Sequence, residues 1–177
     1  NIGMEFRDQA GQLVMIDNPK LDAIFEHVRV RNKVLIGHQG EPYNCWLPLA
    51  QMTVSGDREY FHEHPQYHMY LHPELPSYEE QMAARNRMLD RHKDLHFMGA
   101  HLASLEWSVS ELSQFLDRYP LAVVDMAARM GQLQYQSHRD RAAVRAFIIK
   151  YQDRVLYATD LTQDTDAEPA EIRKEAH

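Results

Sequence analysis

The sequence predicts an α/β protein built around a parallel sheet, and two observations carry that prediction. Short apolar segments, at residues 34–38, 96–101, 121–125 and 155–160, alternate with longer amphipathic segments. Strands that alternate with helices indicate a parallel sheet, because parallel neighbours need a crossover connection. The segment VLIGH at 34–38 is nearly all apolar, which is typical of a strand covered on both faces.

Composition and charge limit the classes of function. The chain has 177 residues, of which 44% are hydrophobic and 25% charged, with a net charge of −7. This predicts one globular domain over residues 1–177 that does not bind nucleic acid, because phosphate contacts need clustered Lys and Arg. The sequence has no apolar run of about 20 residues, so we expect no membrane span. Cys45 is the single cysteine, which excludes an intrachain disulfide and favours the reducing cytoplasm.

The first helix has a clear start and end in the sequence. Asn18 followed by Pro19 is typical of an N-cap with proline in the first turn. The apolar face has helical spacing, and Asn32 and Lys33 end the helix. A small hairpin is expected before it, around residues 10–11. The residues of the apolar face are Leu21, Ile24, Phe25 and Val28.

Residues 39–76 form a long irregular connection, broken by several Pro and Gly residues. A connection this long is usually functional or carries small elements of its own. It contains His62, His64, His68 and His72. Prolines follow His64 and His72 and favour turn geometry. We therefore expect a loop that covers the pocket, with His68 lining the substrate entrance, and not a dedicated zinc site.

Two later helices carry their own start signals. Ser77 and Glu80 form a capping-box pattern, and Ser108 with Glu111 repeats it. Pro120 stops the second of these helices. One face of the first is marked by Met82, Arg85, Met88 and Leu89. Further helices are expected over residues 138–154 and, in the polar tail, from Pro169.

Polar side chains stand at the end of every predicted strand. These residues are His38, His101, Asp125 and Asp160. Ligands of parallel α/β folds bind at the carboxyl ends of the strands. Imidazole and carboxylate suit Zn²⁺ and similar divalent ions. The pattern fits an active site about as well as it fits strand ends that are polar only because they meet solvent.

Four motifs together resemble the amidohydrolase superfamily, in the branch called amidohydrolase family 2. They are VLIGHQGEP, FMGAHLASLEW, VVDMAAR and KYQDRVLYATD, and they extend over roughly residues 17–161. The resemblance implies a metal-dependent (β/α)₈ TIM barrel. It also implies that His38 and Asp160 bind the metal, most simply Zn²⁺ or else Mn²⁺. His101 would bind a second metal or position water or substrate, and Asp160 would also be the general base.

The chain departs from the family pattern in one respect. The family's first strand carries a His-x-His pair, and the HEH at 62–64 lies in the wrong place for it. We therefore expect an incomplete barrel, strands five to eight with their helices. Such a half would have two open edges and could associate with itself. Past the strand ends, Glu41, Glu106 and Arg129 are candidates for substrate contact or for supporting the site.

The resemblance leaves three functions open. The first is a metal-dependent hydrolase that attacks a C–N or C–O bond of a small molecule with metal-activated water. The second is a non-oxidative decarboxylase of an aromatic or unsaturated carboxylic acid. The third is a catalytically incomplete unit that only binds or supports. A nucleotide-binding domain is disfavoured, because it would need a glycine-rich loop between strand and helix.

Overall fold

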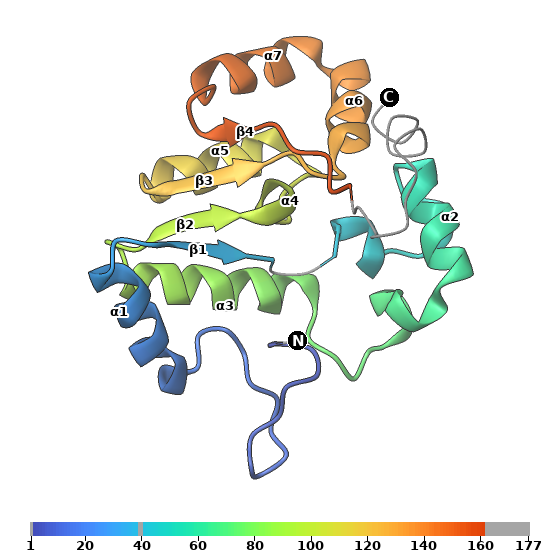
Figure 1. Cartoon of the computed structure of the whole chain (residues 1–177). Coiled ribbons are helices and arrows are strands. Elements are labelled where there is room, and N and C mark those ends of the chain that lie inside the picture. The colour runs from blue at the N-terminus through green and yellow to red at the C-terminus, as the bar shows by residue number, and fades with distance from the viewer. Residues whose placement is uncertain (1, 39–40, 162–177) are drawn as a thin grey trace, which may run out of the picture.

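The computed structural model describes residues 2–38 and 41–161, and its strands form one parallel sheet (Figure 1). The strands are β1 (Val34–Gly37), β2 (His96–Gly99), β3 (Ala122–Asp125) and β4 (Val155–Leu156). They lie in the order β1-β2-β3-β4, and each neighbouring pair is parallel. The predicted α/β class with a parallel sheet is confirmed. β4 is shorter than predicted and ends at Leu156, before Asp160.

The helices for which the sequence has a capping signal begin where that signal indicates. The α-helices are α1 (Asp22–Val30), α2 (Ser55–Glu63), α3 (Tyr78–Arg91), α4 (Ala100–Ala103), α5 (Val109–Arg118), α6 (Met130–Arg139) and α7 (Arg141–Lys150). Ser77 and Glu80 form the capping box of α3, and the Ser108 side chain accepts from the backbone N–H of Glu111. Asn18 caps a short 3-10 turn that leads into α1. No helix within the described residues is both long and apolar enough to cross a membrane.

The carboxyl-terminal helical region differs from the prediction. The helix predicted over residues 138–154 is the shorter α7, and an additional helix, α6, precedes it. Asp140 separates them, and its side chain caps α7 by accepting from the N–H of Ala143. α6 was not predicted, because it begins at Met130 without a side-chain cap. The helix predicted from Pro169 lies outside the described residues. The predicted hairpin near residue 10 is confirmed by an antiparallel bridge between Arg7 and Leu13.

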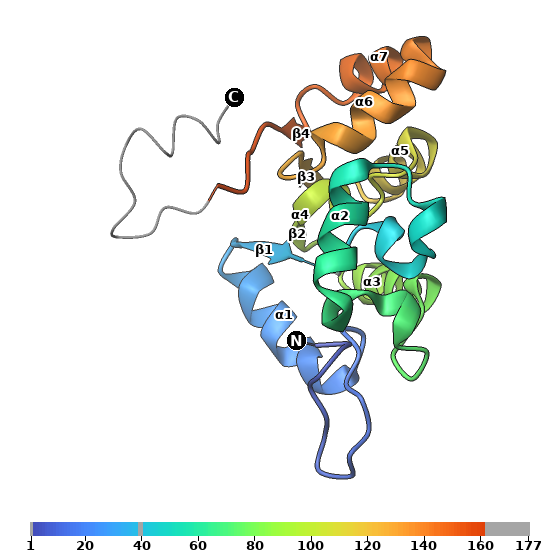
Figure 2. The same ribbon diagram turned by 90° about the vertical axis from the view of Figure 1, so that its right-hand side faces the viewer.

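One face of the sheet is fully covered. Figure 2 shows α3, α5, α6 and α7 on the same side of the strands. Phe97, Ala122 and Val124 point into this layer and are almost completely buried. They form one apolar core with residues of the helices. From α3 and α5 this core includes Met88, Leu89, Leu112, Phe115 and Leu116.

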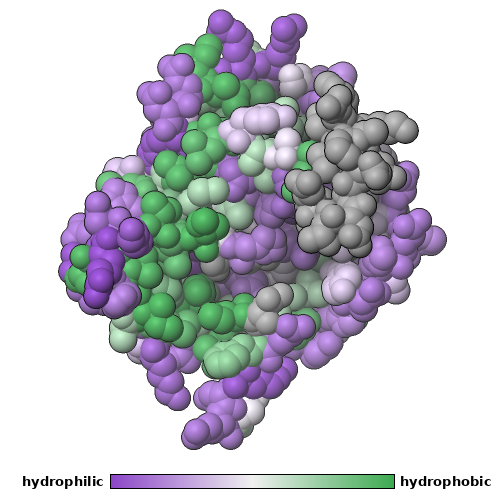
Figure 3. Space-filling view, viewed as in Figure 1, coloured by the Kyte–Doolittle hydropathy of each residue, from purple (hydrophilic) through white to green (hydrophobic). Residues whose placement is uncertain are grey.

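The opposite face of the sheet is open. Val34 and Ile36 are 54% and 65% exposed, and Leu156 is 42% exposed. The prediction that residues 34–38 are covered on both faces is therefore wrong for the described residues. Figure 3 looks onto this side, where apolar side chains gather around β1. Sequential strand order with helices on one face is what consecutive units of a (β/α) barrel show. The described strands form an open sheet, so closure of a barrel stays a prediction.

The long connection before α3 contains structure of its own. Besides α2 it holds 3-10 helices at Tyr43–Trp46, Leu49–Gln51, Pro65–Tyr67 and Met69–Leu71. Its small separate core consists of Cys45, Met52, Phe61 and Met69. The Cys45 thiol donates to the carbonyl oxygen of Tyr67 at 2.9 Å, and burial raises the pKa of this thiol to about 12. The connection is thus folded around a core of its own, and its place over the site stays a prediction.

Truncating a side chain is expected to lower the free energy of unfolding by different amounts on the two faces of the sheet. Phe97→Ala removes a fully buried ring and is expected to lower the free energy of unfolding by about 3 to 5 kcal/mol. Ile36→Ala, on the open face, is expected to change it by less than about 0.5 kcal/mol. Urea unfolding followed by circular dichroism measures both. A large cost for Ile36→Ala would show that the open face is covered in solution.

Candidate functional site

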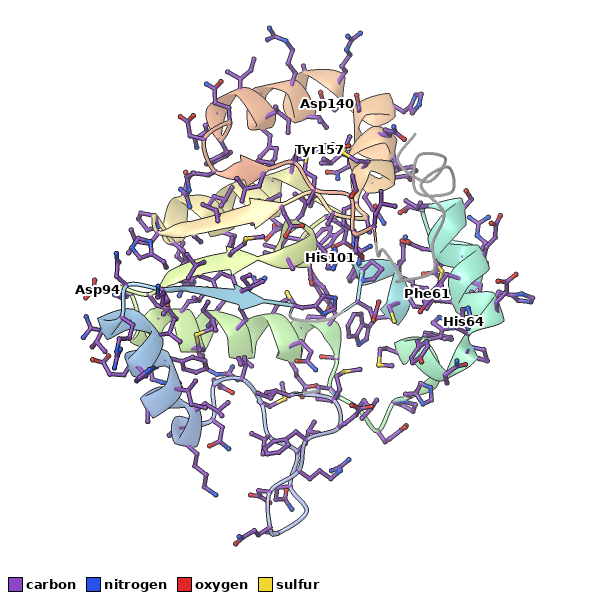
Figure 4. All side chains as sticks on the ribbon, in the orientation of Figure 1. Phe61, His64, Asp94, His101, Asp140 and Tyr157 are labelled. Atoms are coloured by element: carbon purple, nitrogen blue, oxygen red, sulfur yellow. The ribbon has the colours of Figure 1, made fainter. Side chains whose placement is uncertain are left out.

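Two histidines meet at the carboxyl ends of β1 and β2. His38 follows β1 directly, and His101 lies just after β2, at the end of the sheet opposite Asp94 (Figure 4). The two ring centroids are 4.8 Å apart, and the ring planes are at 89°. The structure therefore brings together two of the residues that the sequence singled out.

His101 begins a left-handed turn. All four residues from His101 to Ser104 have φ values between +54° and +57°. A left-handed conformation costs roughly 1–2 kcal/mol per non-glycine residue, and it normally occurs at single positions. The turn folds back so closely over β2 that a Cβ atom on Gly99 would lie 2.5 Å from the Cβ of Ala103. Only glycine fits at position 99, so the close approach of turn and strand depends on it.

Contacts with the end of β3 fix both the backbone and the ring of His101. The Asp125 carboxylate is buried and accepts from the backbone N–H groups of His101, at 3.1 Å, and Ala127, at 3.0 Å. The Nδ1 atom of His101 lies 2.8 Å from the carbonyl oxygen of Ala127. A carbonyl oxygen only accepts, so in neutral His101 the proton is on Nδ1. The Nε2 atom then has a free lone pair and can take up a proton.

The surroundings keep His38 neutral. Desolvation where the ring packs against its neighbours lowers the pKa of His38, and the charges of His101 and Arg129 lower it further. Glu41 and Asp160 act in the opposite direction. The charges of these groups therefore reach His38, although the residue itself is exposed. A neutral imidazole can accept a proton or bind a metal ion.

Glu106 and Arg129 are buried ionisable residues, and the charge of Arg129 acts on both His38 and Glu106. Glu106 is 2% exposed and Arg129 is 8% exposed. One Glu106 oxygen accepts from the N–H of Tyr43 at 2.7 Å, and one Arg129 nitrogen donates to the carbonyl of Ala128 at 2.9 Å. Glu106 Oε2 and Arg129 Nε have no hydrogen-bond partner in the described part of the chain. Burial raises the pKa of Glu106 to about 7, although the Arg129 charge opposes this.

A second polar cluster was not found from the sequence. Asp57 on α2 accepts from the side-chain amides of Asn44, at 2.7 Å, and Gln132, at 2.9 Å. Asn44 and Gln132 are both buried. The cluster therefore ties the long connection to α6 and holds Tyr43 near Glu106. No local pattern connects residues so far apart in the sequence.

The remaining predicted residues lie in different surroundings. Asp160 is exposed with a φ of +65°, and within residues 2–38 and 41–161 no hydrogen bond or ion pair joins it to His38 or His101. His68 is buried in the loop, where its Nε2 lies 2.8 Å from the Leu47 carbonyl oxygen. Its ring stacks between Phe61 and Tyr70. These contacts pack His68 into the loop, and its contact with a substrate stays a prediction.

The predicted metal ligands do not form a complete set. Among the residues that the structure describes, no group of three or more His, Cys, Asp or Glu side chains could hold a metal ion. His38 and His101 are adjacent, and Asp160 is near enough for its charge to act on His38, but the three do not form such a group. The structure thus brings two of the three predicted ligands together, and a Zn²⁺ or Mn²⁺ site stays a prediction.

A cavity of about 480 Å³ opens beside His38. This volume is within the range of small-molecule sites. Most of its lining is apolar and comes from the amino-terminal hairpin, α1 and β1. His38 and Glu41 stand among the lining residues, which also include Ile16, Leu21, Ile24, Phe25 and Ile36. The cavity thus offers an apolar wall that reaches the histidine pair.

Comparisons with known proteins give one structural likeness. No protein-family model matches the chain, and no curated protein matches it. A similar solved structure is the crystal structure of 2,6-dihydroxybenzoate decarboxylase in complex with 2,6-dihydroxybenzoate, with 17% sequence identity and a TM-score of 0.49. The match covers 97% of this chain, which spans 57% of the length of that enzyme chain. Membership of amidohydrolase family 2 stays a prediction from the four motifs.

The pKa of Glu106 predicts a pH-dependent stability. Between its ordinary pKa of 4.5 and about 7, folded Glu106 keeps a proton that the unfolded chain has lost. Stability therefore falls as the pH rises through this window, by about 2 to 3 kcal/mol between roughly pH 5 and pH 8. Glu106→Gln is expected to remove this part of the loss, as measured by urea unfolding across the pH range. Exposed Glu59→Gln is the control, and parallel profiles for Glu106→Gln and the wild type would contradict the assignment.

Proposed function

We propose that the carboxyl end of the sheet is the active site of an enzyme for a small carboxylic acid with an apolar body. The supporting observation is the arrangement of charge and cavity. The apolar cavity reaches His38. Arg129 is a buried cation with an unpartnered N–H, and its charge reaches His38. A buried cation suits an anionic substrate, because it replaces the water that a carboxylate loses on binding.

The reaction that we propose is non-oxidative decarboxylation of an aromatic or unsaturated acid. The carbon that loses CO₂ must gain a proton. His101 is suited to deliver that proton, because its Nδ1–H is held by Ala127 while its Nε2 can take up a proton from water and pass it to the carbon. Glu106, with a pKa of about 7, can supply a proton near neutral pH. Arg129 would hold the substrate carboxylate until it leaves.

Hydrolysis of a C–N or C–O bond is the second candidate. The same free lone pair on His101 Nε2 could take a proton from an attacking water. A neutral amide or lactone gives Arg129 no anion to bind, which is why the acid is preferred. A binding unit without turnover is the third candidate, and the incomplete set of metal ligands is the observation in its favour.

A product assay separates these candidates. The chain is incubated with a panel of hydroxylated benzoic acids, and with amides and lactones of similar size, with and without added Zn²⁺ or Mn²⁺. We expect CO₂ release from an acid, and we expect His101→Asn to slow it by about 10²- to 10⁴-fold. His96→Asn, an exposed histidine at the other end of β2, should leave the rate unchanged. Hydrolysis without CO₂ release would reject the decarboxylase in favour of the hydrolase.

A further inference from the structure

The left-handed turn from His101 to Ser104 needs an outside support. None of its residues is glycine or asparagine, the residues that adopt this conformation most readily. The amino-terminal end of the turn is held by Asp125. The carboxyl-terminal end is held from α3 by Tyr78 and Arg85, which come from another part of the sequence.

Arg85 donates to one carbonyl group of the turn. Its side chain is 1% exposed, and its Nη1 donates to the carbonyl oxygen of Ala103. The other guanidinium nitrogens donate to Asn86, and the group stacks 4.4 Å above the centre of the Phe115 ring. The described residues give Arg85 no carboxylate partner. A buried cation without an opposite charge is costly, so packing alone does not explain an arginine here.

Tyr78 donates to the next carbonyl group. Its hydroxyl lies 2.5 Å from the carbonyl oxygen of Ser104 and accepts from the Trp107 indole N–H at 2.7 Å. Burial raises the pKa of Tyr78, so the hydroxyl keeps its proton and remains a donor. Tyr78 is the first residue of α3, directly after the Ser77 capping box. The start of α3 is thus fixed at the position from which the hydroxyl reaches the turn.

We propose that Arg85 and Tyr78 are positioning residues that keep the left-handed turn closed and thereby hold the ring of His101 against His38. Both are on α3, and both donate to the carbonyl groups of consecutive residues of the turn. Their hydrogen bonds to the turn reach the backbone carbonyls of Ala103 and Ser104, and not a histidine ring. The inference rests on the proposed function only where it links the position of His101 to turnover.

The test follows the ring of His101 in the full chain labelled with ¹⁵N-histidine. At one fixed pH, the ¹⁵N chemical shifts of the ring show which nitrogen carries the proton, and His101→Asn assigns the signals. Wild type is expected to show the proton on Nδ1. Tyr78→Phe should move or broaden these signals. The matched control is Tyr151→Phe, which also removes a buried hydroxyl that donates to a backbone carbonyl, that of Ser113, and should leave them unchanged.

A rescue separates support of the turn from general packing. Ala103→Gly makes the left-handed conformation easy at that residue, so it should restore the His101 signals in the Tyr78→Phe background. A lysine has one nitrogen in place of the three with which Arg85 bonds Asn86 and Ala103. Arg85→Lys should therefore change the His101 signals as Tyr78→Phe does, and Ala103→Gly should restore them. The CO₂ release rate is expected to fall on the order of 10- to 100-fold in Tyr78→Phe and to recover in the double variant.

The outcomes distinguish this inference from the proposed function. Wild-type His101 signals in Tyr78→Phe would overturn it, as would an equal change in Tyr151→Phe or a failure of Ala103→Gly to rescue. If no acid is decarboxylated, the proposed function fails while the ring signals still decide the positioning role. Normal ring signals together with a lowered rate would also overturn it, because the effect would then not pass through His101.

Discussion

The parallel pairing of β2 between β1 and β3 is the constraint on which the rest of the structure depends. It aligns Gly37 with Gly99 and Gly99 with Val124, so the three strands end together. His38, the left-handed turn and Asp125 therefore all lie at the carboxyl ends of these strands. Phe97 packs β2 into the core between sheet and helices, so the position of the site depends on the packing of those helices.

Local signals in the sequence predicted most of the fold. The Ser77 and Ser108 caps mark helix starts because the serine hydroxyl satisfies a free N–H within the same turn. The strands were also placed correctly, but β4 was predicted too long, since its end is set by its short pairing with β3. α6 escaped prediction because its first turn has no side-chain cap. An apolar run also does not show whether a neighbour covers each face, and this is why the open side of β1 was not foreseen.

The candidate site was predictable only in part. The rule that ligands bind at strand ends selected His38, His101 and Asp125, and the structure brings these residues to one edge. The rule says nothing about backbone conformation, so it gave no warning of a left-handed turn at His101. A signal was present in the arginine on the apolar face of α3, Arg85. An arginine among buried methionines and leucines indicates that its hydrogen bonds have a purpose in the interior.

The buried thiol of Cys45 allows opening of the long connection before α3 to be followed chemically. A thiol with a pKa of about 12 holds almost no thiolate at neutral pH, and the thiolate is the form that reacts. Cys45 lies in the small core of the loop, beside Met52 and Phe61. Its ionisation is therefore coupled to separation of that core from its surroundings. Since the chain has one cysteine, the rate at which a thiol reagent modifies the protein measures how often Cys45 becomes exposed.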